Sequence, residues 1–99
     1  MTTLSVIEKA PREFRLFQNY PNPFNPETEI KFSVEQTTRA TVRLYNLIGQ
    51  EIATLFDDVA EAGKYYTVKV RGLNLASGVY FYRLQSAGKS DLKKMLLLK

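Results

Sequence analysis

Apolar and polar residues alternate along three stretches of the chain, at the two-residue period of strands that bury one face. These stretches are residues 28–34, 39–46 and 65–70. Turn signals around Gly49 and Gly63 separate them from their neighbours. Three half-buried strands are therefore predicted. Their apolar faces comprise Ile30, Phe32 and Val34, then Ala40, Val42 and Leu44, then Tyr66, Val68 and Val70.

Further strands are predicted at both ends of this region. A short strand begins at Phe14 and the proline-rich run after it ends that strand. Residues 77–86 are rich in β-branched and aromatic side chains on both faces, which predicts a strand that is partly covered on both sides. Residues 87–89 are typical of a short hairpin link, and residues 92–98 form a last strand. The predicted inward sets are Phe14 and Leu16, with Gln18 as a further candidate, and then Tyr80, Tyr82 and Leu84.

Residues 51–62 carry two competing patterns. Their apolar residues fall at helical spacing, and Gly63 could end a helix. However, an isolated amphipathic helix in a chain of strands needs a sheet face to cover. We therefore expect a strand at residues 51–56 followed by a loop, with a helix as the alternative. The residues at helical spacing are Ile48, Ile52, Leu55, Phe56 and Val59.

Seven short strands with turn signals about every ten residues predict an all-β fold, an immunoglobulin-like antiparallel β-sandwich. The length of 99 residues leaves room for one domain. Residues 1–13 are polar and weakly patterned, so we expect a linker or tail there and the folded module at residues 14–99.

Three prolines lie within residues 21–26, just before the first long alternating stretch. Each proline fixes its own φ and removes a backbone donor, so the path is stiff before any tertiary contact forms. Tyr20 and Phe24 are expected to pin this segment to the core, and its asparagine amides to bond backbone groups that lack ladder partners. A structured loop is therefore predicted in place of disorder.

Composition narrows the classes of function that the chain can have. The chain has no histidine and no cysteine, which removes the commonest general base, metal ligand and thiol nucleophile. We therefore expect no enzyme and no cofactor. Asp57, Asp58 and Glu61 could be imagined as a calcium site, but their spacing fits no EF-hand and a solvated loop is the preferred interpretation.

The net charge of +4 comes from 14 basic and 10 acidic residues. The basic residues are dispersed over many segments, which argues against the clustered footprint of a nucleic-acid binder. No apolar stretch reaches the length that spans a bilayer. Residues 1–10 lack the pattern of an N-terminal export signal, so none is expected there.

Five blocks, in order, resemble the type A C-terminal sorting domain of the type IX secretion system, found in the Bacteroidota and their relatives. The first is FRLFQNYPNPFNP at residues 14–26, continued by TEIKF at residues 28–32. The others are LYNLIGQEI at 44–52, AG at 62–63, SGVYFYRL at 77–84 and KKMLLLK at 93–99. The resemblance covers nearly the whole chain.

The resemblance implies a sorting signal at the C-terminal end of a larger exported protein. Its fold would be an immunoglobulin-like sandwich, and its partners would be the outer-membrane translocon, shuttle proteins and a sortase-like protease. That protease commonly removes the domain and attaches the cargo to a surface lipopolysaccharide. The cargo would pass through the periplasm and be secreted or held at the cell surface, with the domain peripheral to the outer membrane and not spanning it. Any cleavage is expected in residues 1–13, where an accessible backbone is available.

Several residues are candidates for recognition by that machinery. The last strand is expected to be a sheet edge, and recognition of its lysines is favoured over a purely protective role. For the glycine and tyrosine of the fourth block, strand entry and a core tyrosine bonded as in a tyrosine corner are the favoured interpretation. For the proline-rich segment, stabilisation of the fold is favoured over direct contact. The candidates are Lys93, Lys94, Lys99, Gly78, Tyr80, Pro21, Asn22, Pro23 and Asn25.

Two rival functions remain from the sequence. The first is an accessory binding or adhesive module of a surface enzyme, for a carbohydrate or protein ligand. It would need solvent-facing aromatics in one platform, for which Tyr45, Tyr65 and Phe81 are the candidates. The second is a structural spacer.

Overall fold

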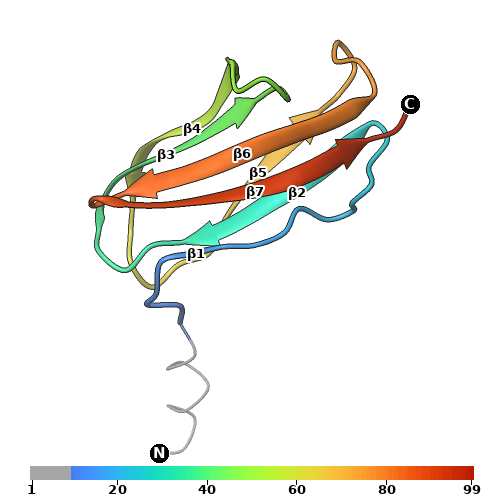
Figure 1. Ribbon diagram of the computed structural model, residues 1–99. Helices are drawn as coiled ribbons and strands as arrows, with labels where there is room; N and C mark the ends of the chain where they lie inside the picture. The colour runs from blue at the N-terminus through green and yellow to red at the C-terminus, as the bar shows by residue number, and fades with distance from the viewer. Residues whose placement is uncertain (1–9) are drawn as a thin grey trace, which may run out of the picture.

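The computed structural model describes residues 10–99, so most of the predicted linker lies outside the described residues. The described part contains seven strands and no helix, in two antiparallel sheets packed as a sandwich (Figure 1). The predicted all-β, immunoglobulin-like fold is confirmed. The strands are β1 (Arg15–Leu16), β2 (Glu27–Ser33), β3 (Thr38–Tyr45), β4 (Glu51–Ala60), β5 (Tyr66–Arg71), β6 (Gly78–Ser86) and β7 (Lys89–Leu97).

The smaller sheet has the order β1-β2-β5 and the larger has the order β4-β3-β6-β7. The strands β2, β3 and β6 are therefore paired on both sides, whereas β4 and β7 are the outer strands of the larger sheet. The β6–β7 hairpin turns through Ala87 and Gly88, both at positive φ, as a two-residue connection with matching twist requires.

The core lies between the two sheets and takes one face of each strand. Phe32 is fully buried there. The centre of its ring lies 5.2 Å from the centre of the Phe56 ring and 5.5 Å from that of the Tyr66 ring. The apolar faces predicted from alternation point inward, as expected. The buried apolar residues are Leu16, Phe24, Ile30, Phe32, Val34, Ala40, Val42, Leu44, Ala60, Val70, Tyr80, Tyr82, Leu84, Met95 and Leu97.

Two predicted segments differ from the structure. The first strand is only two residues long, and Gln18, which was placed on its inner face, is exposed. In the contested region the strand is confirmed over the helix, but the loop predicted after Phe56 is wrong, because β4 continues to Ala60. β4 pairs with β3 along its whole length, with irregularities opposite the Val42/Arg43 and Leu44/Tyr45 positions.

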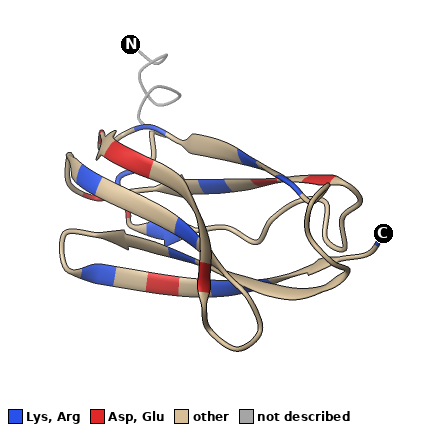
Figure 2. Cartoon of the chain, turned by 90° about the horizontal axis from the view of Figure 1, so that it is seen from above, with Lys and Arg blue, Asp and Glu red and all other residues tan. Residues whose placement is uncertain are grey.

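Lysine and arginine residues lie on both sheets, interspersed with acidic residues (Figure 2). The ion pairs include Arg71 with Glu27 at 2.7 Å and Lys89 with Glu35 at 2.6 Å. This arrangement agrees with solvated sheet faces. Within residues 10–99, no helix is long and apolar enough to span a membrane.

Gly72, just after β5, is in close contact with the end of β7. A Cβ at this position would lie 2.8 Å from Cδ2 of Leu97, whose side chain is fully buried. Gly72→Ala is therefore expected to lower the free energy of unfolding by about 1–3 kcal/mol through overpacking, measured by urea denaturation. In the Leu97→Ala background the same change should cost little, because the clashing atoms are gone. Equal costs in both backgrounds would contradict this account.

Candidate functional site: the proline-rich segment and the last strand

The proline-rich segment, residues 18–26, runs beside β7 (Figure 1). Phe24 forms a parallel bridge with Leu97, in which its N–H donates to the Leu96 carbonyl at 2.9 Å and its carbonyl accepts from the Leu98 N–H at 3.0 Å. The Phe24 side chain is 2% exposed and belongs to the core. The predicted structured loop is confirmed, and Phe24 anchors it.

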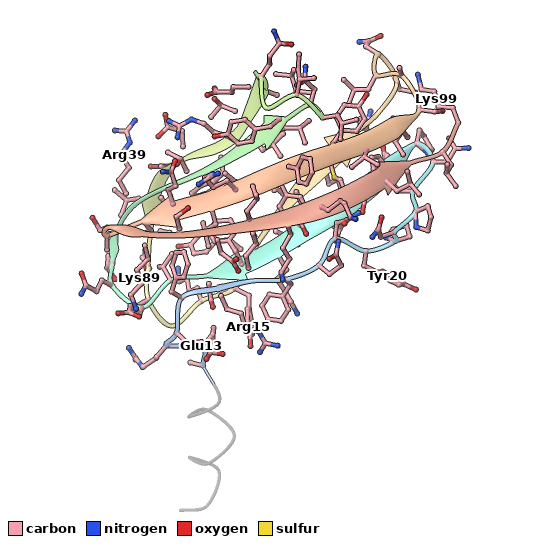
Figure 3. All side chains as sticks on the ribbon, in the orientation of Figure 1. Glu13, Arg15, Tyr20, Arg39, Lys89 and Lys99 are labelled. Carbon is pink, nitrogen blue, oxygen red and sulfur yellow. The ribbon has the colours of Figure 1, made fainter. Side chains whose placement is uncertain are left out.

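The expectation that Tyr20 also pins the segment to the core is wrong. Its side chain is 82% exposed and points into solvent (Figure 3). The cause lies in the backbone, because Tyr20 exchanges hydrogen bonds of 3.0 and 3.1 Å with Glu29 of β2. This pairing fixes which side of the extended chain faces the core, and the tyrosine lies on the other side.

Side-chain amides of the segment also bind the edge of β7. The Gln18 amide donates to the Lys94 carbonyl at 2.6 Å, and the Asn22 side-chain oxygen accepts from the Leu96 N–H at 3.0 Å. The expectation that asparagine amides bond unladdered backbone groups is confirmed for Asn22. β7 is thus an outer strand as predicted, but its edge from Lys94 onward is covered by the chain itself.

Asn19 is the main polar residue that sequence reasoning missed. It is buried, and its N–H donates to the Tyr82 hydroxyl at 2.8 Å, which in turn donates to the Phe17 carbonyl at 2.7 Å. Its side-chain amide donates to the Thr28 hydroxyl at 3.0 Å and to the Pro21 carbonyl at 3.1 Å. These bonds tie the segment to both sheets. The sequence signal that could have identified it is an amide side chain directly before Tyr20 and Pro21, in a segment whose backbone groups lack ladder partners.

The structure brings three of the recognition candidates together. Asn22, Pro23 and Lys94 line one shallow surface hollow of about 280 Å³. Pro21 lines a neighbouring hollow beside Tyr20, and Asn25 is exposed outside both. The floor of the first hollow comprises Val79, Met95 and Leu96.

Gly78 and Tyr80 lie at the start of β6. Gly78 has a φ of 151°, which favours glycine where the chain enters the strand. Tyr80 is buried, and its hydroxyl donates to the Ala76 carbonyl, four residues earlier, at 2.6 Å. This is the arrangement expected from a tyrosine corner, so the side chain of Tyr80 serves the core.

Lys99 lies at the opposite end of β7 from Lys89 (Figure 3). Its ammonium donates to the Leu73 carbonyl at 2.8 Å, and its N–H donates to the Ser77 hydroxyl at 2.9 Å. It therefore closes the loop between β5 and β6 and is separate from the hollow that Lys94 lines. Lys93 is half-buried on the inward side of β7.

The acidic residues considered for calcium are not a loop site. Asp57 and Asp58 belong to β4, and Asp57 pairs with Arg39 at 2.7 Å. Within residues 10–99, no group of three or more metal-ligating side chains is placed to hold an ion.

The three aromatic residues that a carbohydrate module would need in one platform lie on two separate surfaces. Tyr45 and Phe81 are cross-strand neighbours on the outer face of the larger sheet. Tyr65 lies elsewhere, with its ring edge-on to Phe17 at 5.8 Å and the Lys31 ammonium 4.7 Å from both rings. The three aromatics do not form one flat surface, so the rival binding function is not favoured.

Two comparisons with known proteins bear on the family of this chain. No match was found among curated proteins. The family of secretion system C-terminal sorting domains matches residues 18–98, from the first amide on the β7 edge to the residue after the strand. That range includes six of the seven strands, β2 to β7, and the covered edge. The chain therefore belongs to the C-terminal sorting domains of the type IX secretion system and acts as a C-terminal secretion signal for a secreted or cell-surface cargo.

Proposed function

We propose that the outer-membrane translocon and its shuttle proteins recognise this module as a folded unit, at the hollow lined by Asn22, Pro23 and Lys94. The supporting observation is that two distant segments form this surface and are locked together. The Leu96 N–H bonds the Asn22 amide, and the adjacent Phe24 bridge fixes the backbone. A surface fixed in this way loses little conformational freedom when a receptor binds it.

The other candidates divide by position. Lys99 adds positive charge at an exposed position beyond β7, whereas Lys93 is half-buried on the inward side of that strand and would contribute charge only from its edge. Pro21 and Asn25 flank the hollow and shape the approach of the segment. Gly78 and Tyr80 hold the start of β6 in place, and they act on recognition through the fold. None of these roles requires chemistry by the module itself.

After export, a sortase-like protease is proposed to cut on the N-terminal side of Pro11 and to join the cargo to a surface lipopolysaccharide. The Pro11 carbonyl accepts from the Gly63 N–H at 2.8 Å, and the Glu13 carbonyl accepts from the Ser33 hydroxyl at 2.7 Å. A cut within residues 11–13 would require these two hydrogen bonds to open, which is why the proposed cut lies before Pro11.

The direct test is a fusion of residues 14–99 to a periplasmic reporter in a bacterium that has this secretion route. The reporter is expected in the medium or on the cell surface, measured by activity in fractionated cultures. Retention of a folded fusion in the periplasm would refute the proposal.

The contact itself is tested by the double variant Asn22→Ala with Lys94→Glu, which should reduce export while the purified domain still folds. Lys69→Glu, a charge reversal on the other sheet, is the matched control and should leave export unchanged. Truncation of residues 93–99 is less informative, because it also removes the buried side chains of Met95 and Leu97. Normal export of the double variant would exclude this hollow as the recognition surface.

A further inference from the structure

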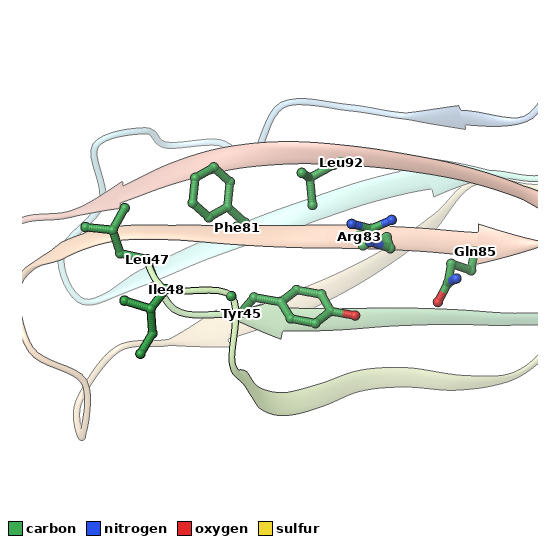
Figure 4. A pocket seen from close by; sticks show the side chains of 8 residues that line it. Tyr45, Leu47, Ile48, Phe81, Arg83, Gln85 and Leu92 are labelled. Carbon is green, nitrogen blue, oxygen red and sulfur yellow. The ribbon is translucent and has the colours of Figure 1, made fainter.

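A separate hollow, of about 500 Å³, lies on the outer face of the larger sheet (Figure 4). Its floor is formed by Tyr45 of β3, Phe81 of β6 and Leu92 of β7, and one wall is the turn between β3 and β4. Leu47 and Ile48 in this turn are 67% and 78% exposed. Contiguous exposed apolar surface of this kind marks an interaction site more often than it marks an ordinary solvated face.

The turn holds Leu47 and Ile48 in place by a dense set of hydrogen bonds. The Asn46 side-chain oxygen accepts from the Ile48 N–H at 3.2 Å and from the Gln50 N–H at 2.9 Å. The Asn46 amide donates to the Gln50 side chain at 2.7 Å, and Gly49 has a φ of 89°. The two apolar side chains are thus presented to solvent by a preorganised backbone, which lowers the ordering cost of binding.

Among the residues that line this hollow, Arg83 is the charged one. Arg83 is on its lining, with its guanidinium 5.9 Å from the centre of the Tyr45 ring and bonded to the Ser90 hydroxyl at 3.2 Å. Lys94 lies directly opposite Phe81 in the ladder. Among residues 10–99, no carboxylate forms an ion pair with either cation, whereas nearby Arg43 is paired with Glu51 at 3.7 Å. An acidic group is therefore the missing complement.

We infer that this hollow, lined by Leu47, Ile48, Phe81 and Leu92 with Arg83 beside them, is a docking site for a polypeptide segment that carries an apolar side chain next to a carboxylate. The apolar side chain fills the space between the turn and the sheet, and the carboxylate pairs with Arg83. A second copy of the chain is disfavoured, because its own Arg83 would face the same unpaired positive charge. A membrane surface is disfavoured because the apolar floor is concave.

The test measures binding of a peptide in which leucine and aspartate alternate to the purified 99-residue chain. Binding is monitored by changes in the NMR chemical shifts of the backbone amides of the chain. Shifts are expected at Gly49, Phe81 and Leu92, and not at Thr67 or Lys69 on the other sheet. A peptide with lysine in place of aspartate should bind at least about tenfold more weakly, corresponding to the loss of a close charge pair. Peptide binding is read without any secretion, so its failure and a failure of the reporter fusion are separate results.

Two variants locate the site. Ile48→Ser and Arg83→Glu should each weaken binding of the aspartate peptide by about tenfold or more. Val59→Ser is the matched control, since Val59 is an exposed apolar residue of β4 in the same sheet but outside the hollow. It should leave the affinity unchanged, and all three variants should unfold cooperatively in urea.

Three outcomes would overturn the inference. The first is equal binding of the lysine and aspartate peptides, or shifts spread over both sheets. The second is binding to vesicles of phosphatidylethanolamine and phosphatidylglycerol without binding to the aspartate peptide, which would assign the surface to a membrane. The third is sedimentation that shows self-association lost in Ile48→Ser, which would assign it to a second copy.

Discussion

Replacement of Phe24 by alanine is expected to lower the free energy of unfolding by about 3–5 kcal/mol, the usual cost of removing a buried phenylalanine. The side chain is 2% exposed and packs in the core cluster with Leu97. The cavity would also loosen the apolar anchor of the proline-rich segment. Urea denaturation followed by tyrosine fluorescence measures the effect.

Tyr20→Ala is the matched control for this substitution. It removes an aromatic ring from the same segment, but from the solvent side, where truncation costs little. A change within about 0.5 kcal/mol is expected. Similar effects of the two substitutions would contradict the distinction between an anchoring and an exposed aromatic residue.

The stability of the domain is expected to fall between about pH 10 and about pH 12 because of Tyr82. Burial raises the pKa of the Tyr82 hydroxyl to about 12, the Asp91 carboxylate adds to the rise, and the hydrogen bond from the Asn19 N–H acts against it. The unfolded state loses the proton near the ordinary pKa of 10.0, while the folded state keeps it. The stabilisation is thus complete below pH 10 and declines by about 1.4 kcal/mol per pH unit above it.

Tyr82→Phe separates this effect from the titration of other groups. At neutral pH it should cost about 1–3 kcal/mol, because the buried Asn19 N–H loses its acceptor. The difference between the variant and the parent protein should shrink as pH rises, since phenylalanine does not titrate. Urea midpoints measured across this pH range test the expectation, and parallel curves for the two proteins would contradict it.

Strands β2 and β3, which are paired on both sides, were predictable because each buries one face against a continuous core. Ile30 and Phe32 in β2, and Val42 and Leu44 in β3, keep strict alternation, and no other regular structure explains that period. The hairpin link at residues 87–89 was also predicted, and the structure places the turn at Ala87 and Gly88.

β4 was ambiguous for a physical reason. In its pairing with β3, Val42 lies opposite Phe56 but Arg43 lies opposite Thr54, so Leu55 is an extra residue. A second irregularity likewise leaves Ile52 without a direct partner. Each extra residue shifts the alternation by one position, and the apolar residues then fall at three- and four-residue intervals that imitate a helix.

The candidate site was only partly predictable. Periodicity identified β7 as a strand, and proline chemistry indicated an ordered segment before β2. Neither signal states which irregular segment covers which edge, because that depends on contacts between residues far apart in the chain. The buried position of Asn19 and the contact of Asn22 with Leu96 therefore required the structure.

The pairing of Asn22 and Phe24 with the end of β7 also bears on protein synthesis. The hollow that carries Asn22 and Lys94 needs residues that are translated more than seventy positions apart, as the separation of 74 between Asn22 and Leu96 shows. A polypeptide that terminates prematurely before β7 lacks half of this surface and two of the buried side chains beneath it. With the proposed recognition surface, only cargo translated through β7 would present the complete hollow, so recognition would also select full-length polypeptides.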